Sequence, residues 1–145
     1  MTLIIIGILA VSAGPLFRPS NAADIASYEA RLLSVLRLQQ HRAMQDTATG
    51  ATYCVLVSDN RFGVPDSCLT PSLPLEFDSE FEGLGVSEQG SITVAATQNL
   101  IYFNALGCPD TSSNGACGVV SVQYTIAGQP AICVQSQGYI RAGVC

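Results

Sequence analysis

The sequence contains no lysine, and charged side chains of any kind make up only 12% of its 145 residues. All six basic residues are arginines, and four of them lie before residue 43. The rest of the chain carries nine acidic residues against two arginines. A nucleic-acid-binding protein needs clustered positive charge to neutralise phosphates. The composition therefore excludes nucleic acid as an expected partner.

The short motifs of common catalytic sites are also missing. Ser87 lies in the sequence GVSEQG, which is not the G-x-S-x-G turn of a serine hydrolase, and there is no glycine-rich phosphate loop. His41 is the only histidine and lies in a helical stretch, where a packed or exposed histidine is far more common than a general base. We therefore expect no catalytic residue, no cofactor and no enzymatic activity.

Acidic residues alternate with other residues in one segment, at Glu76, Asp78, Glu80 and Glu82. This alternation is typical of a strand or loop edge whose acids face solvent. No Asp-x-Asn-x-Asp-Gly loop is present. Binding of calcium or of a partner by residues 76–82 remains an alternative.

Six cysteines lie in the second part of the chain, and none forms a C-x-x-C pair. An even number of cysteines in a small domain is typical of an exported, disulfide-bonded protein. Turn-rich stretches between neighbours favour a sequential pairing among the 15 possible ones. The expected pairs are Cys54 with Cys68, Cys108 with Cys117, and Cys133 with Cys145. A zinc site is the alternative, but the cysteine spacing does not match one and only one histidine is present.

The first 15 residues form an uncharged apolar run that ends in Gly14-Pro15. A helix of about 14 residues is only ~21 Å long, whereas the hydrocarbon core of a bilayer needs about 20 residues. The run therefore indicates a truncated transmembrane helix over residues 1–19, with part of the helix missing before Met1. A secretory signal peptide with an apolar core from Leu3 to Ala13 is the alternative, although no basic residue precedes Arg18.

Residues 20–145, which we call the head, are expected to form one domain. Apolar residues recur with helical period between Ile25 and Ala43, which predicts a helix over about 23–46, and Pro19 favours a break before it. β-Branched and aromatic runs bounded by turn residues predict a sheet over about 51–145. The expected strands are 52–57, 73–77, 91–94, 100–103, 119–126 and 131–134, with a hairpin turn at 127–130. The predicted fold class is α+β, a helix on an antiparallel sheet.

Two parts of the sequence resemble one family. The segment IIGILAVSA, with Gly7 and with Pro15 eight residues later, resembles the N-terminal helix of type IV pilins and type II secretion pseudopilins. The C-terminal third, with IYFNALGCP and ICVQSQGYI, resembles the ending of the GspH/FimT-like minor pilins, and most of all those of mannose-sensitive haemagglutinin (MSHA) pili. The family's basic leader and its F-T-L-x-E opening are absent, so leader processing and subunit docking are assigned to no residue. Residues 59–90 match nothing in the family pattern.

The resemblance implies a pilin-like fold and a structural function. The chain would be a minor pilin that takes part in assembly or priming of a type IV pilus, and a type II secretion pseudopilin is the alternative. Its N-terminal helix, including Gly7 and Pro15, would pack against other major and minor pilins and contact the pilus assembly machinery. The protein would reside in the bacterial inner membrane with its head in the periplasm, and then join a surface pilus. A secreted disulfide-bonded binding or hydrolase domain is a third possibility.

Overall fold

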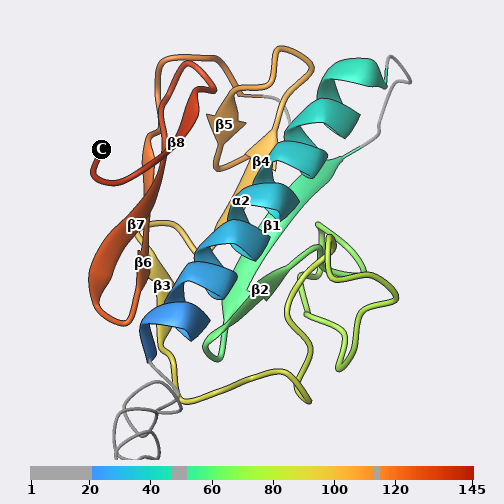
Figure 1. The fold of residues 1–145 in the computed structure, drawn as a ribbon. Coiled ribbons are helices and arrows are strands. Elements are labelled where there is room, and N and C mark those ends of the chain that lie inside the picture. Colours follow the sequence, from blue (N-terminus) through green and yellow to red (C-terminus); the bar gives the residue numbers. More distant parts are fainter. Residues whose placement is uncertain (1–20, 47–51, 113–114) are drawn as a thin grey trace, which may run out of the picture.

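The structure is a computed structural model that describes residues 21–46, 52–112 and 115–145. One long helix, α2 (Asn21–Gln45), lies across two four-stranded antiparallel sheets (Figure 1). This confirms the α+β class with a disulfide-bonded head. The expected helix over residues 1–19, with Gly7 and Pro15, lies outside the described residues. Within the described residues, no helix has the length and apolar character needed to cross a membrane.

The first sheet has the strand order β2-β1-β4-β5. Its central strand is β1 (Tyr53–Ser58), which turns through Asp59-Asn60 into the short strand β2 (Arg61–Gly63). On its other side β1 pairs with β4 (Leu100–Phe103), and β4 pairs with β5 (Pro109–Asp110). All three pairings are antiparallel.

The second sheet has the order β3-β6-β7-β8. Strand β6 (Val122–Ile126) pairs with β3 (Val94–Ala96) on one side and with β7 (Gln129–Val134) on the other. The edge strand β8 (Ile140–Ala142) pairs with β7. A two-residue turn, Ala127-Gly128, joins β6 to β7 with both residues at positive φ, which suits the twist of a tight hairpin.

Some sequence predictions are wrong. The strand expected over 91–94 is instead β3 at Val94–Ala96, and the strand expected over 119–126 is shortened to β6. One sheet was expected, but strands β3 and β6 to β8 form a second one. The chain passes between the sheets within a few residues: β3 ends at Ala96 in the second sheet, and β4 begins at Leu100 in the first. Residues 73–77 were expected to form a strand, but they form a loop. Pro74 cannot donate to a strand ladder, and Leu75 is 73% exposed, so this segment has neither the hydrogen bonds nor the burial of a strand.

The core lies between α2 and the sheets. The buried stripe of α2 follows the helical period and consists of Tyr28, Leu32, Val35, Leu36, Gln39 and Ala43. It packs in one cluster with alternate residues of both sheets, among them Val55 and Ile101 from the first sheet and Val122 and Tyr124 from the second. Tyr124 is fully buried, its hydroxyl has no hydrogen-bond partner among the described residues, and burial raises its pKa.

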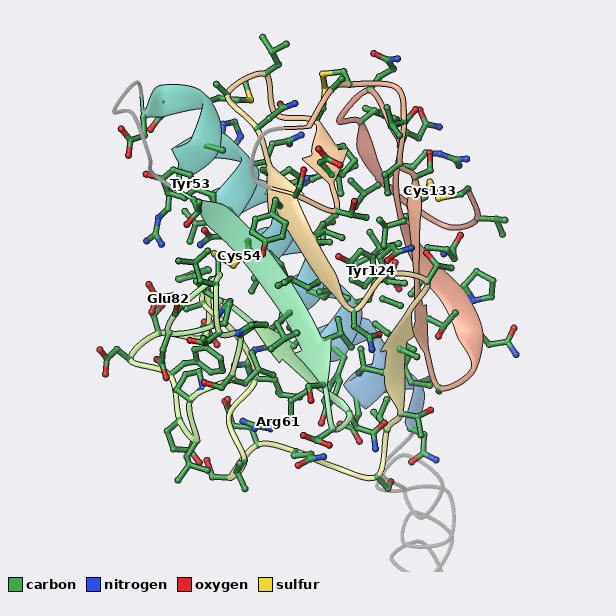
Figure 2. The ribbon with its side chains drawn as sticks, turned by 180° about the vertical axis from the view of Figure 1, so that it is seen from behind. Tyr53, Cys54, Arg61, Glu82, Tyr124 and Cys133 are labelled. Carbon is green, nitrogen blue, oxygen red and sulfur yellow. A yellow bond between two sulfur atoms is a disulfide. The ribbon has the colours of Figure 1, made fainter. Side chains whose placement is uncertain are left out.

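All six cysteines are in disulfides, Cys54–Cys68, Cys108–Cys117 and Cys133–Cys145. This is the sequential pairing expected from the sequence. The bonds span 14, 9 and 12 residues of sequence, so each closes a local loop. Cys54 lies on the first sheet and Cys133 on the second (Figure 2). No disulfide therefore joins the two sheets.

Candidate functional site

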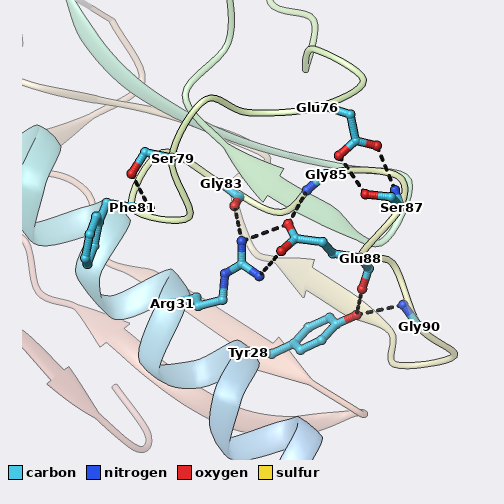
Figure 3. A network of polar contacts seen from close by, with 10 residues as sticks. All are labelled: Tyr28, Arg31, Glu76, Ser79, Phe81, Gly83, Gly85, Ser87, Glu88 and Gly90. Atoms are coloured by element: carbon cyan, nitrogen blue, oxygen red, sulfur yellow. Dashed lines mark hydrogen bonds and ion pairs between the residues drawn. The ribbon is translucent and has the colours of Figure 1, made fainter.

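The most extensive polar network in the described residues lies where residues 64–93 pass along α2. This segment, which we call the 64–93 connection, links β2 to β3 and has no strand of its own apart from an isolated bridge between Gly63 and Gly83. Side chains from the first turns of α2 reach into it (Figure 3). It contains six of the head's acidic residues, Asp66, Glu76, Asp78, Glu80, Glu82 and Glu88.

Arg31 is the centre of this network. Its guanidinium makes a two-point contact with Glu88, with Nη1–Oε1 at 2.8 Å and Nη2–Oε2 at 2.9 Å. Nη2 also donates to the carbonyl oxygen of Gly83 at 2.8 Å. One helical side chain thus fixes two points of the connection (Figure 3). Planar, two-point recognition of a carboxylate is the interaction for which arginine is better suited than lysine.

Tyr28, one turn earlier on the same face of α2, holds the end of the connection. Its hydroxyl donates to the carbonyl oxygen of Glu88 at 3.1 Å and accepts from the backbone N–H of Gly90 at 2.7 Å. The ring is buried and contacts Phe62 edge to face, with centroids 6.4 Å apart. Tyr28 therefore links the core to the connection through both its ring and its hydroxyl.

Charge pairing shifts the titration of both partners of the ion pair. The hydrogen bonds from Arg31, followed by the N–H of Gly85, hold the pKa of Glu88 below its ordinary value. The same contact with Glu88 raises the pKa of Arg31. Both groups therefore stay charged over a wider pH range than they would in water.

The residues singled out from the sequence as possible catalytic groups are not assembled. Ser87 donates through its hydroxyl and its backbone N–H to the carboxylate of Glu76, both at 2.8 Å. His41 is exposed on α2, and Glu80 is exposed in the connection. Among the described residues, no hydrogen bond or ion pair joins Ser87, His41 and Glu80 to one another. The carboxylate of Glu76 accepts from both donors of Ser87, so this contact fixes a turn and does not activate the Ser87 hydroxyl through a histidine.

The acidic segment 76–82 lies in a loop and not in a strand. Its acids make different contacts. Glu76 accepts a hydrogen bond from Ser87, and Glu82 lies 3.5 Å from Arg42. Asp78 and Glu80 are exposed, as is Glu76. A hollow of about 270 Å³ beside the segment is lined by Asp66, Glu76, Asp78 and Glu82 together with Val64, Pro65, Pro74 and Phe77. Within the described ranges, no three His, Cys, Asp or Glu residues come together as metal ligands would.

A second fixed junction lies at the C-terminal end of α2. The side-chain amide of Gln40 donates to the carbonyl oxygens of Gly107 and Gly138, at 2.7 and 2.5 Å. These glycines belong to the loops after β4 and after β7, so one helical residue connects both sheets. Three large apolar side chains beside this junction, in space or in sequence, are exposed: Met44, Leu106 and Tyr139.

Comparison with known proteins identifies no relative. No protein-family model, curated protein or solved structure matches this chain. The network of Tyr28, Arg31 and Glu88 was not predicted from the sequence, because its contacts join residues that are 52 to 62 positions apart. The available signal was the spacing of Tyr28 and Arg31, which places both on one face of a helix.

Proposed function

We propose that this chain is a minor pilin subunit that takes part in assembly or priming of a type IV pilus of the MSHA type. Its role is structural: residues 1–19 anchor it in the bacterial inner membrane, and the head lies in the periplasm before the subunit joins a surface pilus. The proposal rests on the resemblance of the N-terminal run and the C-terminal third to pilins. The α+β head agrees with it but is not specific to it.

The observation that supports the proposal most directly is the division of α2 into two faces. One face is buried against both sheets. The other face includes the exposed residues Ala23, Ala26, Ala30 and Arg37, and residues 16–20 lie between the apolar sequence of residues 1–15 and the start of the helix. A long helix that packs on a head with one face and leaves the other free is suited to side-by-side packing with the helices of other pilins.

Fractionation tests the proposal. The full-length protein is expressed in a host that has no pilus machinery, and the inner membrane and the soluble periplasm are separated. The gene is expressed with its native upstream coding sequence, and we expect the protein in the inner membrane, because a complete pilin anchor of about 20 apolar residues inserts stably. Mature protein in the soluble periplasm, beginning at Gly14 or Ala23, would contradict the proposal and favour a cleaved signal peptide.

Gene deletion in the native host separates the pilin from its near alternative. Loss of surface pili with normal protein secretion supports the minor pilin, whereas loss of secretion with normal pili supports a type II secretion pseudopilin of the GspH type. Hydrolysis of a peptide, ester or glycan by the purified protein, lost on substitution of Ser87, His41 or Glu80, would overturn both structural functions.

A further inference from the structure

The three disulfides differ in how accessible they are to solvent. Cys54 and Cys68 are 0% and 9% exposed, and Cys108 is 3% exposed with a half-buried partner, Cys117. In the third bond Cys133 is fully buried, but Cys145 is exposed. Of the six cysteines, all of which the structure describes, only Cys145 is exposed. The Cys145 sulfur lies 3.5 Å from the carbonyl oxygen of Val122. Of the three disulfides, this one offers a thiolate in solution the easiest approach.

The segment that Cys145 closes is held by few other contacts. Gln123 of β6 makes two of them, since its Oε1 accepts from the N–H of Cys145 at 2.7 Å and its Nε2 donates to the carbonyl oxygen of Gly143 at 3.2 Å. Arg141 donates to the carbonyl oxygen of Val144, and the backbone N–H of Gly143 donates to the carbonyl oxygen of Ala131 in β7 at 2.7 Å. The side chain of Val144 is 63% exposed, so it contributes little burial. The disulfide is the one covalent cross-link that holds residues 143–145, and the other contacts are single hydrogen bonds.

Strand β8, which precedes this segment, is itself weakly held. It is three residues long and lies at the edge of the second sheet, with β7 as its only strand partner in the described residues. Ile140 is its one buried side chain. Figure 1 shows the C-terminus beside β8 at this outer edge, away from the first sheet. Release of residues 140–145 would leave the pairings of β1 with β4 and of β6 with β7 in place.

We propose that the Cys133–Cys145 bond is a thiol-exchange site, at which a dithiol releases residues 140–145 from the second sheet while the other two disulfides and the α2 core stay intact. One thiolate of the dithiol attacks the Cys145 sulfur, the bond breaks, and Cys133 leaves as a thiolate that takes a proton from water. The second thiol then attacks the mixed disulfide and releases Cys145 as a thiol. The protein disulfide gains two electrons and two protons, and the dithiol becomes a disulfide.

Timed reduction with dithiothreitol tests this assignment on the full chain in detergent micelles. Samples are quenched with one alkylating reagent, fully reduced, labelled with a second reagent and mapped by mass spectrometry. We expect Cys133 and Cys145 to be modified at least about tenfold faster than the other four cysteines, as accessibility controls attack. Hydrogen exchange at that stage is expected to rise in residues 140–145 and to stay unchanged in β1 and β4.

Two variants sharpen the test. Gln123→Leu removes both side-chain contacts to the segment, together with those of Nε2 to the carbonyl oxygens of Tyr124 and Ile132. It is expected to speed reduction of Cys133–Cys145 several-fold and to leave the other bonds unchanged. Gln129→Leu, an exposed position in the hairpin, is the matched control and is expected to change no rate. Equal reduction rates for all three bonds, earlier reduction of Cys54–Cys68, or loss of protection in β1 when only Cys133–Cys145 is open would overturn the assignment. These outcomes do not depend on whether the protein joins a pilus.

Discussion

Arg31 and Glu88 form a two-point ion pair between residues that are 57 positions apart in the sequence. Arg31 is in the third turn of α2, and Glu88 is near the end of the 64–93 connection. With the contact from Arg31 to Gly83 and those from Tyr28, the pair holds a segment of 30 residues that has no strand of its own against the helix. This junction holds the part of the connection that follows the acidic segment 76–82.

Replacement of Glu88 by glutamine tests the ion pair. The pKa of Glu88 is lower in the folded protein than in the unfolded chain, so its carboxylate stabilises the fold at pH values above the unfolded-chain pKa. This contribution is lost as the pH falls through the pKa in the folded protein. Because the Glu88 side chain is 44% exposed, screening by water keeps the expected loss small, about 0.5–1 kcal/mol at pH 7. Urea unfolding at pH 7 and pH 3 measures it, and the variant should lose less stability on acidification than the wild type. Asp78→Asn, at an exposed position, is the control, and an equal effect of both substitutions would contradict the prediction.

Removal of the Tyr28 hydroxyl separates its polar contacts from its packing. Tyr28→Phe keeps the ring that packs on Phe62 but leaves the N–H of Gly90 and the carbonyl oxygen of Glu88 without this partner. We expect a loss of about 1 kcal/mol, the usual net value of a hydrogen bond, and faster amide exchange of Gly90. Unchanged exchange at Gly90 would show that the hydroxyl does not hold the connection. Tyr139→Phe, at an exposed position in the described head, is the matched control.

The sequence predicted the elements whose signals are local. The periodic apolar residues of α2 gave a helix over 23–46 against the observed Asn21–Gln45, and β1, β4 and the turn at Ala127-Gly128 were close to their observed places. Strands β2, β5 and β8 have two or three residues each and hold their places through neighbouring strands, so no local pattern marks them. Residues 73–77 were predicted as a strand from an apolar and aromatic run bounded by turn residues, but Pro74 and the lack of a pairing strand among the described residues leave a loop. The contacts of Arg31 depend on where a long connection returns to the helix, which a single sequence does not encode locally.

Substitution of Gly138 tests the junction at the end of α2. A Cβ on this residue would lie 2.5 Å from the carbonyl oxygen of Gly107, and Gly138 has a φ of +88°. Gly138→Ala therefore combines a left-handed backbone with a clash and is expected to cost about 2 kcal/mol or more. Gly128→Ala is the matched control, with a φ of +75° and open space around its Cβ, and should cost only about 1 kcal/mol. Thermal unfolding of both variants measures the difference, and equal losses would rule out the clash.

The Cys54–Cys68 bond is expected to be the main covalent support of the first sheet. It joins β1 to the start of the 64–93 connection and closes a loop across 14 residues of sequence. The Cys54→Ser, Cys68→Ser double variant should lose about 3 kcal/mol, because the unfolded chain regains the entropy of the open loop. Guanidinium unfolding under non-reducing conditions gives the value. A loss below about 1 kcal/mol would show that packing around β1 suffices without the bond.

The proposed pilin function predicts that the sensitive positions lie in the N-terminal run. Gly7→Leu places a bulky side chain where helices in a membrane need small residues to approach one another. We expect fewer surface pili, counted by electron microscopy, with the protein still in the membrane at normal abundance. Leu9→Ile keeps the apolar character and volume of its position and is the control. Normal pilus numbers in the Gly7→Leu strain would argue against helix packing through this residue.

The local pattern of the disulfides has a mechanical consequence. Each bond closes its own short loop, within 54–68, 108–117 or 133–145, and none crosses from α2 to a sheet or from one sheet to the other. A pulling force that enters through the N-terminal end of α2 is therefore resisted by noncovalent contacts. Among them are the buried stripe of the helix and the side chains of Tyr28, Arg31, Gln40 and Arg42. Under tension, α2 should peel away from the sheets first, while the three covalent loops keep their length.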